Sequence, residues 1–99
     1  MAVVKPLELH PEALLEGEEA VAWYAERDIR VSTQFANDLE MAMQRIAEAP
    51  HRWPLYLHGT RRVRLTRFPF LLPYRDDPLR ILIVAIAHAK RKPGYWKDR

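Results

Sequence analysis

The spacing of apolar residues changes near the middle of the chain, and this change constrains the fold more than any other feature. Before Pro50 the apolar residues recur every three to four positions, which is typical of helices that bury one face. After Pro54 they alternate with polar residues or form short runs, which is typical of strands. Proline at both positions prevents a helix from continuing across this boundary. The sequence therefore predicts helices followed by a sheet.

The first half predicts one short strand and two helices. Residues 3–9 are expected to form a strand, which Pro6 confines to a sheet edge or a bulge. Pro11 suits the first turn of a helix over about residues 12–27. Its apolar face consists of Leu14, Gly17, Val21 and Tyr24, and its acidic face of Glu12, Glu16, Glu18, Glu19 and Glu26. A second helix is predicted over residues 31–48, with an apolar face of Val31, Phe35, Leu39, Ala42 and Ile46. The two helices should form an antiparallel hairpin that a sheet covers.

The second half predicts three strands of that sheet, over residues 62–66, 68–74 and 80–88. In the first of them Val63 and Leu65 alternate with arginines, so the apolar side chains face the core and the arginines face outward. The last strand is the most continuous apolar run and is expected in the middle of the sheet. The order β-α-α-β-β-β predicts one α+β domain over residues 1–99, a helix hairpin packed on a curved antiparallel sheet.

Composition excludes several classes of protein. The 99 residues are 48% hydrophobic and 29% charged, which is usual for a globular domain and argues against disorder. The absence of cysteine excludes a disulfide scaffold, a Cys-ligated zinc site and a thiol nucleophile. The longest apolar stretch, residues 81–87, is far too short to span a membrane. Residues 1–10 lack the pattern of a signal peptide, so a cytoplasmic protein is expected.

The net charge of +3 hides a strong division between the two halves. Residues 1–50 carry four Lys or Arg and ten Asp or Glu, a net charge of −6. Residues 51–99 carry twelve Lys or Arg and three Asp or Glu, a net charge of +9. Such a division favours one face built for an anionic partner, such as nucleic acid or an acidic protein surface. The alternative is that an acidic helix pair packs on a basic sheet and the two halves balance each other.

Several segments together resemble the RelE/ParE toxin superfamily. They are Ala22-Trp23-Tyr24, residues 35–50, Arg67-Phe68-Pro69-Phe70 with Tyr74, residues 81–88, and Arg91-Lys92-Pro93-Gly94-Tyr95-Trp96. The resemblance extends from about Leu14 to Trp96. It implies the toxin of a bacterial type II toxin–antitoxin module, associated with plasmid stabilisation, growth arrest and neutralisation by a cognate antitoxin. RelE-like members cut mRNA on the ribosome, whereas ParE-like members inhibit DNA gyrase.

A RelE-like endoribonuclease needs a base, an acid and cations for the phosphate. The resemblance points to His88, Arg91 and Tyr95 as catalytic residues, with Arg62, Arg64 and Arg67 on a neighbouring strand. However, that strand has arginines where RelE itself uses lysines as acid or base, and an arginine does not lose its proton. His88 would then have to be the main proton-transfer group of the site. Alternatively, His88 is a structural histidine at the end of a strand. The remaining histidines are scattered, so we expect no metal site and no cofactor.

A ParE-like gyrase inhibitor needs no catalytic group, only a basic and aromatic docking surface, and the tail favours this hypothesis. The predicted target-binding residues are Arg62, Arg64, Arg67, Arg91, Lys92, Tyr95 and Trp96, with Lys97 and Arg99 beside them. Tyr95 and Trp96 could instead be a hydrophobic plug that closes one end of the core. The arginines of the strand could instead be a solvated face.

A cognate antitoxin is the partner that both hypotheses share, and the complex is expected to oligomerise through it. Acidic antitoxin segments suit the basic half, and exposed apolar side chains would take their apolar face. Candidates are Trp23, Trp53, Phe68 and Tyr74, although the core is the expected place for each of them. Two further alternatives are a non-toxic nucleic-acid-binding module and a non-toxic antitoxin-binding module. No membrane partner is expected.

Overall fold

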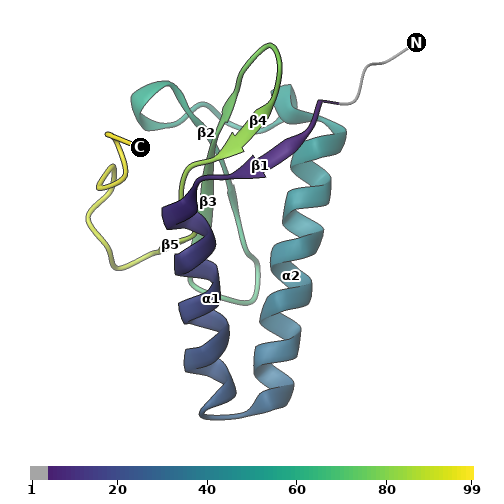
Figure 1. The fold of residues 1–99 in the computed structure, drawn as a ribbon, viewed down its shortest axis with the longest axis vertical. Coiled ribbons are helices and arrows are strands. Elements are labelled where there is room, and N and C mark those ends of the chain that lie inside the picture. The colour runs from purple at the N-terminus through teal and green to yellow at the C-terminus, as the bar shows by residue number, and fades with distance from the viewer. Residues whose placement is uncertain (1–4) are drawn as a thin grey trace.

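The computed structural model describes residues 5–99, and Figure 1 shows a hairpin of two helices packed beside a twisted sheet. The helices are α1 (Pro11–Ala25) and α2 (Ile29–Glu48). Strand β1 (Leu7–Leu9) precedes them and lies at the edge of the sheet, as Pro6 predicts. The first two residues of the predicted strand, Val3 and Val4, lie outside the described residues.

Side-chain caps fix where each helix begins. At α1, His10 Nδ1 accepts a hydrogen bond from the backbone N–H of Glu12 (3.1 Å). At α2, the Asp28 carboxylate accepts from the backbone N–H of Arg30 (2.9 Å), which together with the Arg30 side chain lowers the pKa of Asp28. Ala49 ends α2 immediately before Pro50, which begins a short 3-10 turn. The predicted helix boundaries are therefore confirmed to within two residues.

The buried face of α1 agrees with the predicted one at Gly17, Val21 and Tyr24 and differs from it at Leu14. Ala13, Gly17 and Ala20 are buried, whereas Leu14 is 52% exposed. A Cβ atom on Gly17 would lie 2.9 Å from Ile86 Cδ1, so the helix approaches the sheet closely only because its contact residues are small. Leu14 instead lines a groove between α1 and α2.

The sheet contains four more strands: β2 (Arg61–Arg64), β3 (Phe70–Asp76), β4 (Ile81–Ile83) and β5 (Ala87–His88). Their order is β1-β4-β3-β2, with β5 also paired to β3. The α+β fold with a helix hairpin on a sheet is confirmed, but the sheet is mixed because β1 and β4 run parallel. The edge strand β1 therefore differs from the predicted antiparallel arrangement. The chain passes from α2 through β2 and β3 before it reaches β4, and β4 then runs in the same direction as β1.

The predicted strand over residues 80–88 is divided into β4 and β5. Ile83 pairs with Tyr74 and Ala87 pairs with Leu71, so four steps along one strand face three steps along the other. This extra residue makes a bulge over residues 84–86. Pro73 lies opposite the bulge and has no N–H to donate, so a regular ladder cannot continue there. The bulge turns the Ile86 N–H toward α1.

Both faces of the sheet are covered. The helix face carries the larger apolar cluster, which includes Phe35, Leu72 and Tyr74. The opposite face, called here the outer face, carries a second cluster of Val84, Ala85, Ala87 and Trp96. Residues 89–99, called here the C-terminal segment, form this outer layer without regular secondary structure and are drawn in yellow in Figure 1. Within the described residues no helix is long and apolar enough to cross a membrane.

Candidate functional site

Trp96 holds the C-terminal segment against the outer face of the sheet. Its side chain is 1% exposed and packs with Val84, Ala85 and Ala87. Its ring centroid lies 6.0 Å from that of Tyr56. Because a buried indole cannot contact a partner, the predicted role of Trp96 in target binding is corrected. Trp96 instead closes the outer-face cluster, which is the alternative that the sequence left open.

A carboxylate on α1 joins the same segment to the rest of the molecule. Glu16 Oε1 accepts hydrogen bonds from the backbone N–H of Ile86 (3.1 Å) and from Arg99 Nη1 (2.8 Å). Glu16 Oε2 accepts from the Tyr95 hydroxyl (2.5 Å) and from Arg99 Nη2 (3.2 Å). The side chains of Glu16 and Arg99 are only 12% and 17% exposed. These four residues are called here the Glu16 cluster.

The Glu16 cluster limits the chemistry of Tyr95. Burial, the hydrogen bond to Glu16 and the charge of Glu16 all raise the pKa of Tyr95 above its usual value. Near neutral pH the hydroxyl therefore keeps its proton and donates a hydrogen bond to Glu16. A general base must be deprotonated, and a general acid must be free to reach the leaving oxygen. In this arrangement Tyr95 is a structural donor, and its catalytic role stays a prediction.

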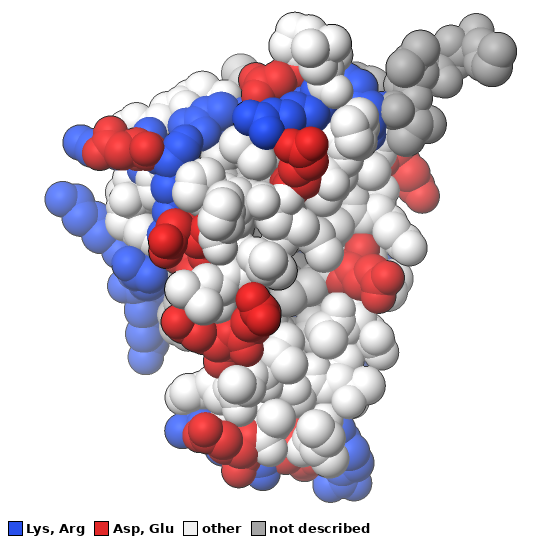
Figure 2. All heavy atoms as spheres, viewed as in Figure 1, with Lys and Arg blue, Asp and Glu red and all other residues white. Residues whose placement is uncertain are grey.

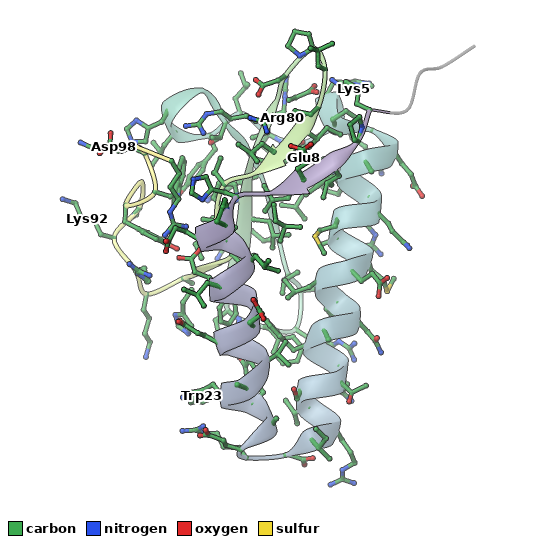
Figure 3. The ribbon with its side chains drawn as sticks, in the orientation of Figure 1. Lys5, Glu8, Trp23, Arg80, Lys92 and Asp98 are labelled. Atoms are coloured by element: carbon green, nitrogen blue, oxygen red, sulfur yellow. The ribbon has the colours of Figure 1, made fainter. Side chains whose placement is uncertain are left out.

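Four cations of the C-terminal segment are exposed: Lys90, Arg91, Lys92 and Lys97. They are called here the basic surface. Blue atoms project from this side of the molecule in Figure 2, and Figure 3 shows Lys92 pointing away from the sheet. The Arg91 guanidinium stacks on the Tyr95 ring at 3.7 Å and lies 3.5 Å from Glu16 Oε2. Two predicted target-binding residues, Arg91 and Lys92, thus lie together on a surface that the Glu16 cluster supports.

His88 lies on the helix face of the sheet, away from most of the predicted cations. It pairs with Phe70 on β3, and the two ring centroids are 5.0 Å apart. His88 Nδ1 accepts a hydrogen bond from the backbone N–H of Lys90 (3.1 Å), which assigns the proton of the neutral ring to Nε2. His88 thus offers a donor and no free acceptor. A base that removes the proton of a 2′-hydroxyl needs the reverse.

A pocket of about 530 Å³ opens beside His88, between α1 and the ends of β3 and β5. Trp23, Phe70 and Ile86 form much of its apolar wall, and its polar lining consists of Glu16, Glu19, His88 and Arg91. Trp23 is 52% exposed and points away from the hairpin (Figure 3). The volume lies within the range of small-ligand sites in proteins. His88 and Arg91 are the only members of the predicted catalytic set that line this pocket.

The arginines of β2 lie elsewhere. The pleat directs Val63 to the helix face, so Arg62 and Arg64 point to the outer face. Arg62 lies over the Tyr56 ring at 4.6 Å, and Arg64 is exposed. Arg67 forms an ion pair with Asp38 (2.8 Å), and hydrogen bonding to Asp38 raises the pKa of Arg67. The sheet therefore separates Arg62 and Arg64 from His88, so the predicted nuclease residues do not form one constellation.

The predicted antitoxin contacts are also divided by the fold. Trp23 is exposed, but Tyr74 is fully buried and donates its hydroxyl hydrogen bond to the Pro50 carbonyl (2.5 Å). Trp53 and Phe68 are partly buried against the core. Tyr74 is therefore a core residue, as the alternative stated in the sequence analysis has it. Its place on β3 puts it on the same face as Leu72, which the pleat directs to the helices.

Two features escaped the sequence analysis. One is an apolar groove of about 590 Å³ between α1 and α2, lined by Leu14, Val21, Leu39, Met43 and others. Periodicity placed Leu14 on the buried face and so concealed the groove. The other is Glu16, which the same periodicity assigned to a solvated acidic face. Within residues 5–99, no group of three or more His, Asp or Glu side chains could hold a metal ion.

Comparisons with known proteins agree with this geometry. A family model described as the ParE toxin of the type II toxin–antitoxin system, parDE, matches residues 7–93. A solved structure described as the chromosomal ParDE TA system from P. aeruginosa aligns with a TM-score of 0.77 and 18% identity, covering 88% of this chain and 98% of that chain. At this identity the structural likeness concerns the fold. No curated protein matches the chain.

Proposed function

The chain belongs to the ParE toxin family of type II toxin–antitoxin systems, and from this premise we propose that it inhibits DNA gyrase in the bacterial cytoplasm. The observation that carries the proposal is the basic surface. Lys90, Lys92 and Lys97 are exposed on a segment that buried Trp96 holds in place. A fixed group of cations suits a complex of a protein with DNA, because oriented positive charge attracts phosphates.

The state of the proton-transfer groups also supports an inhibitor that does no chemistry. The Tyr95 hydroxyl is bonded to Glu16, and His88 presents a donor from the helix face. The alternative, a ribosome-dependent mRNA endonuclease, rests on the pocket beside His88. That pocket holds His88 and Arg91, beside Glu16 and Glu19, against a wall that includes Trp23 and Phe70.

Neutralisation by a cognate antitoxin is the second part of the proposal. The groove between α1 and α2 offers Leu14, Val21 and Met43 to an apolar helix face. Exposed Trp23 lines the separate pocket beside His88 and offers a second apolar contact outside the groove. The basic surface would attract acidic residues of the same partner.

A gyrase assay with the purified chain tests the proposal, scoring both lost supercoiling and trapped cleaved DNA. We expect inhibition by the wild-type chain and at least a tenfold loss of potency in the variant Lys90→Ala/Lys92→Ala/Lys97→Ala. The matched control is Lys5→Ala/Arg30→Ala/Arg80→Ala, which removes the same charge from cations that have carboxylate partners. This control should keep its potency.

Absence of gyrase inhibition by folded wild-type protein would contradict the proposal. The variant His88→Ala then separates the candidates through growth arrest on expression. An inhibitor of gyrase should keep most of its toxicity without the imidazole, whereas a nuclease should lose it. Cleavage of mRNA on ribosomes by the wild-type chain, abolished in His88→Ala, would establish the alternative.

A further inference from the structure

We propose that Glu16 is a positioning residue, which fixes the C-terminal segment so that the basic surface can engage its target. This inference rests on the proposed role of that surface. Glu16 itself is largely buried and does not belong to the surface. Its position in the second turn of α1 brings the carboxylate to the bulge between β4 and β5 and to the end of the chain.

Glu16 accepts hydrogen bonds from two separate parts of the chain. The bulge supplies the Ile86 N–H, and the C-terminal segment supplies the Tyr95 hydroxyl and the Arg99 guanidinium. Both carboxylate oxygens are used, Oε1 by two donors and Oε2 by three, the third being Arg91 Nη1 at 3.5 Å. A carboxylate with ionised and neutral donors on both oxygens holds them in a defined geometry.

The donors have few other acceptors within the described residues. Arg99 also donates to the Val84 carbonyl (3.2 Å), and the Arg99 carbonyl accepts from Arg75 (3.1 Å). Without Glu16, the Tyr95 hydroxyl and the Ile86 N–H would lose the bonds described above. The Arg99 cation, whose side chain is 17% exposed, would lose its acidic partner. Poorly exposed groups without partners are costly, so the segment would leave this position or rearrange.

The position of Arg91 follows from this cluster. Its guanidinium stacks on the Tyr95 ring at 3.7 Å, and Glu16 holds that ring through its hydroxyl. Arg91 and its neighbours Lys90 and Lys92 continue directly from β5, while Lys97 follows Trp96. The chain turns between Lys92 and Lys97, and Tyr95 and Trp96 pack on the inner side of this turn. Trp96 anchors the C-terminal segment by its burial, and Glu16 fixes the orientation of the segment by hydrogen bonds.

The test compares Glu16→Gln with Glu26→Gln, an exposed carboxylate at the C-terminal end of α1. Amide hydrogen exchange measures order in residues 89–99, with α2 as the internal standard for global stability. Growth arrest on expression measures function whether or not gyrase is the target. We expect at least tenfold faster exchange in the segment and at least tenfold weaker toxicity for Glu16→Gln. Glu26→Gln should match the wild type in both.

A rescue experiment distinguishes positioning from direct contact with the target. The chain has no cysteine, so Glu16→Cys/Arg99→Cys can be joined by a short bis-maleimide reagent that restores the link between α1 and the segment. Gyrase inhibition by the purified protein should fall in the unlinked double variant and return after cross-linking. Neither single cysteine variant should respond to the reagent.

Three results would overturn the inference. Glu16→Gln could leave exchange in the segment unchanged, or it could loosen the segment without any loss of toxicity. The cross-linked protein could also recover slow exchange without recovering inhibition. If wild-type protein arrests growth without inhibiting gyrase, the proposed target is wrong. Glu16→Gln and Glu26→Gln then still decide the inference through exchange and growth arrest.

Discussion

His88 and Tyr95 both carry groups that can transfer protons, and hydrogen bonds within the chain decide what those groups do. The Lys90 N–H occupies His88 Nδ1, and Glu16 occupies the Tyr95 hydroxyl. The side-chain identities alone suggest an acid and a base. In the structure both act as hydrogen-bond donors, whereas a nuclease base needs a free acceptor, so their catalytic role stays a prediction.

Tyr74 gives a prediction at the scale of one residue. Burial raises its pKa to about 12, from an ordinary value of 10.0. The stabilising contribution of the neutral phenol is therefore fully present below about pH 10 and is lost as pH rises through 12, by roughly 3 kcal/mol. We expect Tyr74→Phe to be less stable than wild type near pH 8, because the Pro50 carbonyl loses its donor. Between pH 9 and 12, however, the variant should lose less stability than wild type.

Urea unfolding at a series of pH values measures this difference. The control is Tyr56→Phe, which removes a hydroxyl from a ring of the outer-face cluster. It should retain the slope of stability against pH of the wild-type protein over the alkaline range. An identical slope for Tyr74→Phe and wild type would show that the Tyr74 phenol does not contribute to alkaline unfolding.

At the scale of elements, the C-terminal segment has no regular secondary structure and yet completes the fold. Its only fully buried large side chain is Trp96, which covers β5 and the bulge. The bulge in turn exists because Pro73 interrupts the ladder of β3. One proline on a central strand thus determines where the last strand breaks, and the break presents the Ile86 N–H to Glu16.

Removal of the C-terminal segment tests this element. We expect a chain that ends at Ala89 to cause no growth arrest, because it lacks the basic surface. It should also be less stable, since the loss of a buried tryptophan costs about 3–5 kcal/mol. Trp96→Ala separates the two effects, because it keeps every cation of the segment but removes the anchor. Thermal unfolding should place Trp96→Ala well below wild type, and growth arrest by a folded truncated chain would contradict the role of the segment.

At the scale of the whole molecule, the two oppositely charged halves partly neutralise each other. Carboxylates of the first half pair with cations of the second: Glu8 with Arg80, Glu16 with Arg99, and Asp38 with Arg67. Figure 3 shows Glu8 and Arg80 side by side where β1 meets β4. The alternative that the halves balance each other is thus correct for these pairs. The cations of the basic surface remain mostly outside them, and they lie together.

This distribution predicts a difference between two variants of equal net charge. Lys90→Ala/Lys92→Ala/Lys97→Ala and Lys5→Ala/Arg30→Ala/Arg80→Ala each remove three positive charges. The first set is grouped and exposed, whereas each cation of the second set has a neighbouring carboxylate that weakens its field. We expect the first variant to elute from a heparin column at clearly lower salt than the second. Elution of both at the same salt concentration would show that net charge alone governs polyanion binding.

The sequence by itself determined the order of elements and the fold class. The change from helical to alternating spacing, together with Pro11 and Pro50, marks the two helices because local backbone preferences act over a few residues. The sequence also indicated the family, because the matching segments are recognised by their residue types and their order along the chain. The exact strand ends were harder to predict, because the division of residues 80–88 into two strands depends on Pro73 in another strand.

Which of the predicted site residues lie close together depends on the tertiary structure. Periodicity separates apolar from polar positions, but it does not say which polar side chains meet. The contact between Glu16 and Arg99 joins residues that are 83 positions apart, and the separation of His88 from Arg62 depends on the pleat and register of β3. Long-range pairing of this kind arises from packing of the whole chain, because the fold determines which donors lie close enough to pair with a buried charge.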